Sequence, residues 1–338
     1  MKITTIGLDI AKQVFQVHAA DAEGRVVFRK RLRRNQLAAF FANFPPCVVG
    51  LEACCGSHYW VRVLTRCGHS VRLIAPQFVK PYVKSNKNDA NDAEAICEAV
   101  SRPQMRFVAA KSVEQQDIQS LHRVRSRLVS SRTQLGNQIR GLLMEYGIVL
   151  PQHLGQLRRG LPLVLEDASN ELTALSRRFF ASLQDELLSL EEKIAALDEQ
   201  IVVVHRASEP CQRIAAVEGI GPLTATALVA AISDGKAFKN GRQFAAWLGL
   251  VPKQHSSGGK ARLLGISKRG DTYLRTLLIH GARSVVYRAS RKTDQRSLWI
   301  AEKQRKLGTS KACVAVANKN ARIVWSLIAH EVPYRRAA

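Results

Sequence analysis

The chain has 338 residues, and its 51 lysines and arginines outnumber 27 aspartates and glutamates, which gives a formal net charge of +24. A surface this positive favours an anionic partner, and a nucleic-acid backbone is the natural one. No apolar run approaches the roughly 18 residues that a membrane-spanning helix needs, and no basic and then apolar leader begins the chain. We therefore expect a cytoplasmic nucleic-acid-binding protein of more than one domain, with no membrane partner.

The cysteines and histidines do not suggest a structural metal. The seven cysteines form no Cys-x-x-Cys pair, and none of the nine histidines has the spacing of a zinc site. We expect reduced thiols, as in other cytoplasmic proteins.

The first part of the chain, residues 1–112, alternates strand-like and helix-like segments. Apolar and β-branched runs predict five strands, over 3–9, 13–19, 25–32, 47–52 and 70–74. Helical patterns fall at 36–44 and 58–66. Three strands followed by alternating helices and strands are typical of a mixed α/β domain of the ribonuclease-H type.

Residues 113–208 are predicted to form a long helical arm. Its first helix is rich in arginine and has an apolar face between residues 121 and 142. In its second helix the apolar residues alternate at spacings of four and three, as in the seam of a coiled coil: Leu183, Leu187, Leu190, Ile194, Leu197, Ile201 and Val204. This stripe predicts a homodimer or homotetramer, unless it packs against the arm's own first helix.

Residues 209–338 are predicted to form a third, mainly α-helical domain. It opens with Gly219-Ile220-Gly221-Pro222, a glycine-rich turn before a helix whose free N–H groups are able to hold a phosphate. Gly219 and Gly221 are therefore candidate nucleic-acid contacts. The domain's cations are candidates as well: Lys260, Lys268, Arg269, Arg275, Arg283, Arg288, Lys303, Arg305, Lys306, Lys311, Lys319 and Arg322.

Four acids are candidates for a metal site. Asp9 ends the first predicted strand and Glu52 the fourth, while Asp89 and Asp92 lie three residues apart at the start of a helix. Carboxylates at the ends of neighbouring strands converge, and oxygen ligands suit Mg²⁺. Any one of them alone is more simply a solvated strand end or a helix cap. Four acids in this order within a basic α/β chain favour a Mg²⁺ site.

These motifs resemble a known family, the DEDD transposases of the insertion-sequence-110 type, in the branch named after insertion sequence 1111. In the N-terminal part the likeness rests on Gly7-Leu8-Asp9-Ile10-Ala11-Lys12, Leu51-Glu52-Ala53 and Lys87-Asn88-Asp89-Ala90-Asn91-Asp92-Ala93. In the C-terminal part it rests on Gly219-Ile220-Gly221-Pro222, Ser256-Ser257-Gly258-Gly259-Lys260 and Gly265-Ile266-Ser267-Lys268-Arg269-Gly270-Asp271.

The resemblance implies a function beyond what the residue patterns show. It implies a RuvC-like N-terminal domain in which Asp9, Glu52, Asp89 and Asp92 bind Mg²⁺, and a C-terminal serine that becomes covalently joined to DNA. That serine is Ser257 when the motif is aligned forward from Pro252 and Ser256 when it is aligned backward from Ser267, and we slightly favour Ser257. The implied partners are the DNA of element ends and target, and a structured bridge RNA encoded by the element.

Two other functions remain open from the sequence. In a metal-only junction resolvase the four acids would activate water, and the C-terminal domain would only bind DNA. In an inactive nucleic-acid-binding protein the acid site would have decayed. The complete set of four acids argues against the second alternative, and the Ser256-Ser257-Gly258-Gly259-Lys260 motif argues against the first.

Overall fold

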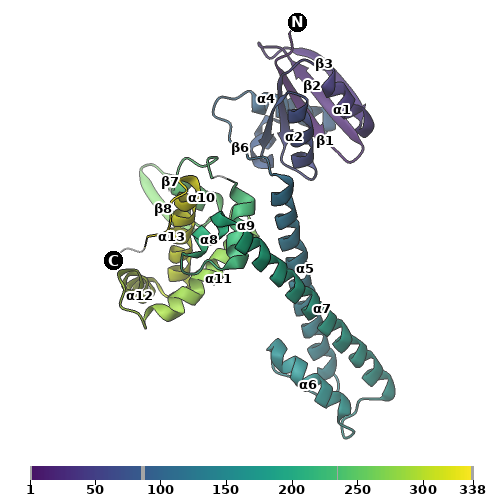
Figure 1. The fold of residues 1–338 in the computed structure, drawn as a ribbon, viewed down its shortest axis with the longest axis vertical. Helices are drawn as coiled ribbons and strands as arrows, with labels where there is room; N and C mark the ends of the chain where they lie inside the picture. The colour runs from purple at the N-terminus through teal and green to yellow at the C-terminus, as the bar shows by residue number, and fades with distance from the viewer. Residues whose placement is uncertain (1, 85–87, 234, 336–338) are drawn as a thin grey trace. The chain divides into compact units, whose positions relative to one another are not determined.

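The computed structural model describes residues 2–84, 88–233 and 235–335, and its helices and strands are drawn in Figure 1. The chain divides into two compact units, Met1–Val113 and Glu114–Ala338. Each unit has a hydrophobic core of its own. A further division of the second unit between residues 208 and 209 stays a prediction.

The N-terminal unit is built on a six-stranded sheet with the order β3-β2-β1-β4-β5-β6. Its strands are β1 (Thr5–Ile10), β2 (Val14–Ala20), β3 (Val26–Arg33), β4 (Val48–Glu52), β5 (Ser70–Ile74) and β6 (Phe107–Val108). The first three form an antiparallel meander, β4 and β5 run parallel to β1, and β6 pairs antiparallel at the edge. The predicted mixed α/β character is confirmed, and the assignment to the ribonuclease-H and RuvC type stays a prediction.

Helices cover both faces of this sheet. They are α1 (Arg34–Ala42), α2 (Ser57–Arg66), α3 (Pro76–Val79), the 3-10 turn η1 (Lys80–Tyr82) and α4 (Asp89–Val100). Apolar side chains of α1 and α2, such as Phe41 and Trp60, pack in one cluster with Leu8 of β1. Helix α4 lies on the opposite face, where its backbone meets Gly7 of β1 and its Ile96 and Val100 side chains meet Gly50 of β4. The sheet is therefore the middle of three layers (Figure 1).

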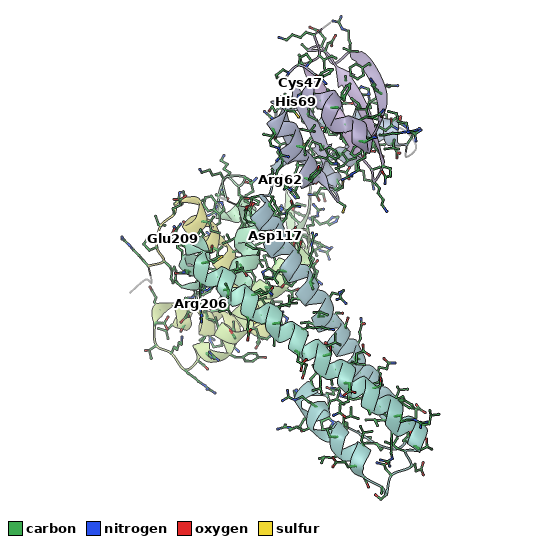
Figure 2. All side chains as sticks on the ribbon, turned by 45° about the vertical axis from the view of Figure 1, so that its right-hand side comes forward. Cys47, Arg62, His69, Asp117, Arg206 and Glu209 are labelled. Atoms are coloured by element: carbon green, nitrogen blue, oxygen red, sulfur yellow. The ribbon has the colours of Figure 1, made fainter. Side chains whose placement is uncertain are left out.

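A buried polar contact between Cys47 and His69 lies in the core beside α1. Figure 2 labels Cys47 and His69, whose Sγ and Nδ1 atoms lie 3.5 Å apart in the interior. The other ring nitrogen of His69 lies 2.9 Å from the carbonyl oxygen of Phe41. Both ring nitrogens thus have partners, as a buried imidazole requires. All seven cysteines of the chain are free thiols.

The second unit begins with three helices, α5 (Val113–Met144), α6 (Leu154–Glu166) and α7 (Ala174–Ala207). Leu187, Leu190 and Ile194 of α7 share one buried cluster with residues of α5, among them Leu135 and Ile139. The predicted apolar stripe is therefore packed against helices of the chain's own arm, α5 and also α6 through Leu157 and Leu161. The coiled-coil geometry and the homodimer or homotetramer stay predictions, and this stripe no longer supplies the reason for an oligomer.

The rest of the second unit is mainly helical, as predicted. Its elements are α8 (Glu209–Ala215), α9 (Pro222–Ile232), α10 (Gly241–Trp247), β7 (Pro252–Ser257), β8 (Lys260–Ile266), α11 (Thr272–Ala289), α12 (Gln295–Leu307) and α13 (Thr309–Ala329). The helices enclose a core that includes Leu228, Phe244 and Leu278. The hairpin of β7 and β8 was not predicted from the sequence. Throughout the described ranges, every helix is too short or too polar to cross a membrane.

Candidate active site and nucleic-acid interface

Two of the predicted acids end neighbouring strands at the same edge of the sheet. Strands β1 and β4 are parallel, and Leu8 is in register with Leu51. Asp9 and Glu52 each follow one residue later, so both lie where the two strands finish. Both residues are half-buried. The structure thus brings these two carboxylates to one place, as the sequence predicts for the ends of adjacent strands.

Helix α4 supplies the other two acids because its backbone lies directly on β1. A Cβ atom on Gly7 would lie 2.1 Å from the carbonyl oxygen of Ala93, so only glycine permits this approach. Asp89 and Asp92 occupy the first turn of α4, and the side chain of Asn88 caps it by accepting a hydrogen bond from Ala90 N. The packing role of Gly7 was not predicted, although a glycine inside an apolar strand is a signal of close backbone approach.

The four carboxylates interact through their charges. The pKa of Asp9 is raised from 3.8 to about 6, first by burial and then by the negative charges of Asp89, Asp92 and Glu52. Nevertheless, within residues 2–84, 88–233 and 235–335, no three His, Cys, Asp or Glu side chains lie close enough to form a metal cluster. The two findings agree because Coulomb repulsion acts over longer distances than metal ligation. An all-oxygen set of repelling acids fits a hard cation such as Mg²⁺.

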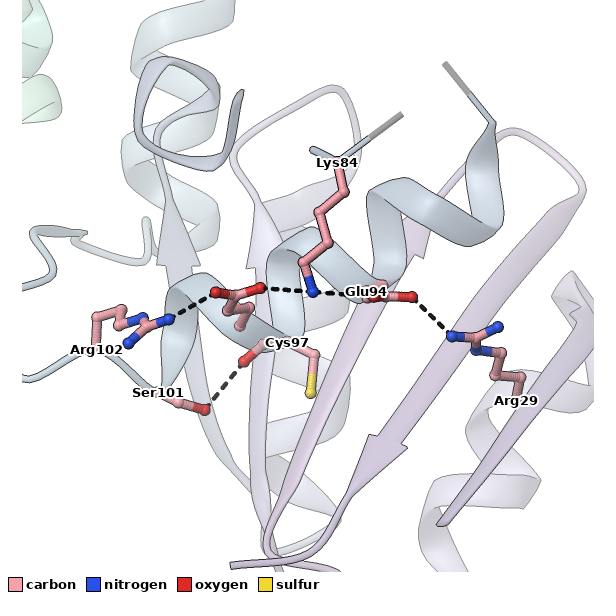
Figure 3. Close-up of polar contacts among 7 residues, drawn as sticks. Arg29, Lys84, Glu94, Cys97, Ser101 and Arg102 are labelled. Carbon is pink, nitrogen blue, oxygen red and sulfur yellow. Dashed lines mark hydrogen bonds and ion pairs between the residues drawn. The ribbon is translucent and has the colours of Figure 1, made fainter. Parts of the chain in front are cut away.

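A network of ion pairs lies along α4, on Glu94 and Glu98, two and six residues after Asp92 (Figure 3). Lys84 lies between Glu94 and Glu98, at 3.3 and 3.2 Å, while Arg29 of β3 is 2.7 Å from Glu94. Arg102 pairs with Glu98 at 2.6 Å. Each exposed pair stabilises little by itself. Together they connect α4 to β3 and to the segment that precedes residues 85–87, which lie outside the described residues and include Lys87 of the predicted motif.

The predicted serines lie in the second unit, on the β7–β8 hairpin. Gly258 and Gly259 form its turn with φ angles of 54° and 77°, which favour glycine. All residues of β7 are exposed. By composition alone, residues 252–266 would be a flexible polar linker. In the structure they form an exposed β-hairpin.

The two serines point to opposite faces of the hairpin, because side chains alternate along a strand. Ser257 is paired with Lys260, and His255, on the same face, is paired with Arg262. Ser256 is paired with Ala261, and its hydroxyl accepts a hydrogen bond of 2.9 Å from the Gln254 amide. Ser257 thus shares its face with two cations and an imidazole.

The predicted nucleic-acid contacts lie in different environments. Lys260, Lys268 and Arg269 are exposed. Arg275 is only 7% exposed, and its guanidinium donates to the carbonyl oxygens of Leu248 and Arg269. Arg275 therefore stabilises the loop that carries Lys268 and Arg269.

The two glycines of the candidate phosphate turn also differ. Gly221 is exposed and caps helix α9. The α-carbon of Gly219 faces the carbonyl of Gly281 in α11, where a Cβ would lie 2.8 Å from the oxygen. Gly219 therefore allows the turn to pack closely, and Gly221 is the one accessible to a phosphate.

Comparison with known proteins gives consistent matches over almost the whole chain. Residues 6–148 match the profile of DEDD transposases of the IS110 group, and residues 211–297 match that of the "Transposase IS116/IS110/IS902 family". The chain is 54% identical to the "Probable family 20 transposase" of Pseudomonas aeruginosa, with 99% of each chain covered. It is 47% identical to the "Transposase for insertion sequence element IS1111A" of Coxiella burnetii, covering 99% of this chain and 92% of the relative.

A third relative has a similar name and coverage. The "Transposase for insertion sequence element IS1328" of Yersinia enterocolitica is 41% identical, with 96% of each chain covered. The matches and the acid site define the class of this protein as a DNA transposase. The chain belongs to the IS116/IS110/IS902 family of transposases, and its similarity to the IS1111A protein supports the branch indicated by the sequence motifs.

Proposed function

We propose that this transposase cuts and rejoins DNA at the ends of an insertion sequence, with Ser257 as the nucleophile and Mg²⁺ held by Asp9, Glu52, Asp89 and Asp92. The observation that carries the proposal is that Asp9 and Glu52 follow paired residues of the parallel strands β1 and β4, while helix α4, which begins with Asp89 and Asp92, packs on Gly7 of β1. The charges of the other three acids also help to raise the pKa of Asp9, after burial. The names of the relatives, which are transposases of insertion sequence elements, support the choice of DNA substrate.

The four carboxylates place negative charge where a cation would bind together with the DNA phosphate. Carboxylate repulsion at Asp9 is offset when a cation binds. When bound, Mg²⁺ supplies Lewis-acid stabilisation of the phosphate's developing charge. The β1–β4 edge and the first turn of α4 hold the backbone of the four acids, and their side chains would have to move closer together to ligate the cation.

Ser257 is a better candidate than Ser256 because of its face on the hairpin. A serine hydroxyl is a weak nucleophile that needs activation by a base or a charged neighbour. Lys260 and Arg262 are suited to bind the phosphate, and His255 is suited to take the hydroxyl proton. The serine oxygen would attack phosphorus, a phosphoserine ester would form, and the bond to a deoxyribose oxygen would break, with that oxygen taking up a proton.

The RNA partner and the assembly are part of this proposal through the family resemblance. A bridge RNA would join target and donor DNA, and a homodimer or homotetramer would hold the two. The net charge of +24 supports binding of several nucleic-acid strands.

The alternative function is a metal-dependent resolvase in which water attacks the phosphate and no covalent intermediate forms. The acid site favours it equally, because the same four carboxylates serve both mechanisms. Only the hairpin residues separate the two. An inactive nucleic-acid-binding protein is the remaining alternative, and it would show no cleavage at all.

The test uses purified protein, a duplex with the DNA that flanks the gene, and RNA transcribed from the same flank. We expect wild type to form a protein–DNA adduct that survives denaturation, and Ser257→Ala to lose it. Ser256→Ala is the matched control and keeps the adduct. If the double alanine variant still cleaves and rejoins the DNA, the resolvase mechanism replaces the serine mechanism.

A further inference from the structure

A groove of about 900 Å³ opens in the C-terminal unit between α10, α12 and α13. In Figure 1 the labels of α10, α13 and the β7–β8 hairpin lie in one region of that unit. Its lining includes Arg242 of α10, Trp299 of α12, and Lys311, Lys319 and Arg322 of α13. Pro252 and Ile266, at the base of the hairpin, also line it.

The groove carries a high density of exposed positive charge. None of the described residues that line it is acidic. Arg242, Lys311, Lys319 and Arg322 are all exposed, and in the part of the chain that the structure describes none of the four forms an ion pair. Four unneutralised cations around one concave surface create a potential that binds anions.

The cations of α13 lie along one face of that helix. Lys311, Lys319 and Arg322 are eight and three residues apart, which places them on one side at 3.6 residues per turn. The distance along the axis from the first to the last is about 16 Å at roughly 1.5 Å per residue. That length corresponds to about five phosphates at roughly 3.4 Å per phosphate on one strand of a duplex.

Two tryptophans of the groove wall make polar contacts. The Nζ atom of Lys319 lies 4.2 Å from the centre of the Trp299 ring, a cation–π contact that holds the ammonium in place. Trp325 donates from its Nε1 to the carbonyl oxygen of Gly235 at 3.1 Å. Burial and the charges of Arg296 and Arg322 lower the pKa of Lys319. A bound anion would relieve that repulsion.

We propose that this groove binds the phosphate backbone of the DNA strand that leads to the cleaved phosphate, through Arg242, Lys319 and Arg322. The inference rests on the proposed function, because Pro252 and Ile266 of the hairpin that carries Ser257 line the groove. Ser257 lies at the other end of β7, about 17 Å from Pro252 at roughly 3.3 Å per residue. The occupant we propose is the DNA being cut, because it is the strand that must pass along the hairpin to reach Ser257.

The test measures binding alone, so it does not depend on cleavage. A triple variant, Arg242→Gln with Lys319→Gln and Arg322→Gln, is compared with wild type on duplex DNA over a range of salt concentrations. A protein that neutralises Z phosphates has a slope of about −0.9 Z in log affinity against log salt. Loss of three contacts should make the slope shallower by about 3 and weaken binding about 100-fold at about 0.15 M salt.

The matched control removes three exposed cations that lie on the arm and have no ion pair in the described structure: Arg159→Gln, Arg178→Gln and Lys193→Gln. Both triple variants lose the same net charge, so only the position differs. We expect the control to retain most of the wild-type slope. Equal loss in both variants, or an unchanged slope in the groove variant, would overturn the proposal.

Two further measurements distinguish the groove proposal from RNA binding in the groove and from the serine mechanism itself. Duplex RNA of the same sequence should lose less affinity than DNA in the groove variant, and an equal or larger loss for RNA would overturn the choice of DNA. The double variant Ser256→Ala with Ser257→Ala should keep the full slope. If that variant abolishes the adduct but the groove variant binds normally, the serine mechanism stands and the groove proposal fails.

Discussion

Single carboxylates at the acid site are predicted to matter for cleavage and not for folding. The pKa of the Asp9 carboxyl group is raised by burial and by three other acids. Asp9→Asn removes its negative charge and therefore relieves the repulsion between Asp9 and those acids. We expect DNA cleavage in Mg²⁺ to fall at least about 100-fold for Asp9→Asn or Asp92→Asn, with an unchanged or higher melting temperature. Full cleavage by either variant would disprove the metal-site assignment.

Gly7 is predicted to set the position of α4 and thereby of Asp89 and Asp92. In Gly7→Ala the new Cβ would lie 2.1 Å from Ala93 O and 2.5 Å from Cys97 N, so the helix must shift. We expect about 1–3 kcal/mol of destabilisation and reduced cleavage. Gly141→Ala is the control, because that helical glycine has open space around it and alanine favours the helix. Unchanged stability and cleavage in Gly7→Ala would contradict the account.

At the scale of elements, the sequence predicts those whose burial leaves a periodic pattern. The strands β1, β2, β4 and β5 carry buried apolar residues on the sheet, and all were predicted near their observed bounds. Strand β7 has no buried residue, so it leaves no alternation of apolar and polar positions. Only the Gly258-Gly259 turn marks it, and that signal also fits a linker.

The candidate site was predictable to the extent that its residues end predictable elements. Asp9 and Glu52 end apolar strands, and Asp92 lies at a helix start, so their positions follow from local pattern. The helices that pack on the apolar stripe of α7 could not be predicted, because the period of the pattern does not say whether a second chain or the chain's own helices cover it. Similarly, charge alone did not distinguish the buried Arg275 from the exposed Arg269.

A buried histidine connects three helices of the second unit and predicts a pH dependence. His122 of α5 lies 3.0 Å from both Thr226 Oγ1 of α9 and Tyr273 Oη of α11. Burial, and then the charge of Arg125, lower its pKa from 6.5 to about 4. The unfolded state therefore binds the proton more readily, so stability is lost as pH falls from about 6.5 to about 4.

That loss should amount to about 3 kcal/mol in the free energy of unfolding of the second unit. Urea unfolding followed at a series of pH values measures it. The variant His122→Gln keeps a hydrogen-bonding side chain that does not titrate, so its stability should fall less over the same range. An equal fall in both proteins would show that other groups cause the pH dependence.

For the whole molecule, the acids and the serines belong to different compact units, with Asp9 in residues 1–113 and Ser257 in residues 114–338. The proposed mechanism requires both units to act on the same DNA phosphate. A net charge of +24 supplies affinity for nucleic acid throughout the chain. In the proposed mechanism, the acids and the hairpin determine which phosphate of the bound DNA is attacked.

The most direct test of this mechanism is to find the atom to which the cleaved DNA is joined. After reaction in Mg²⁺ with flanking DNA and its RNA, the denatured protein is digested with nuclease and protease and analysed by mass spectrometry. The serine mechanism predicts a nucleotide on the peptide that contains Ser257, attached at that residue and absent from Asp92→Asn. Complete DNA cleavage with no nucleotide on either Ser256 or Ser257 would contradict it.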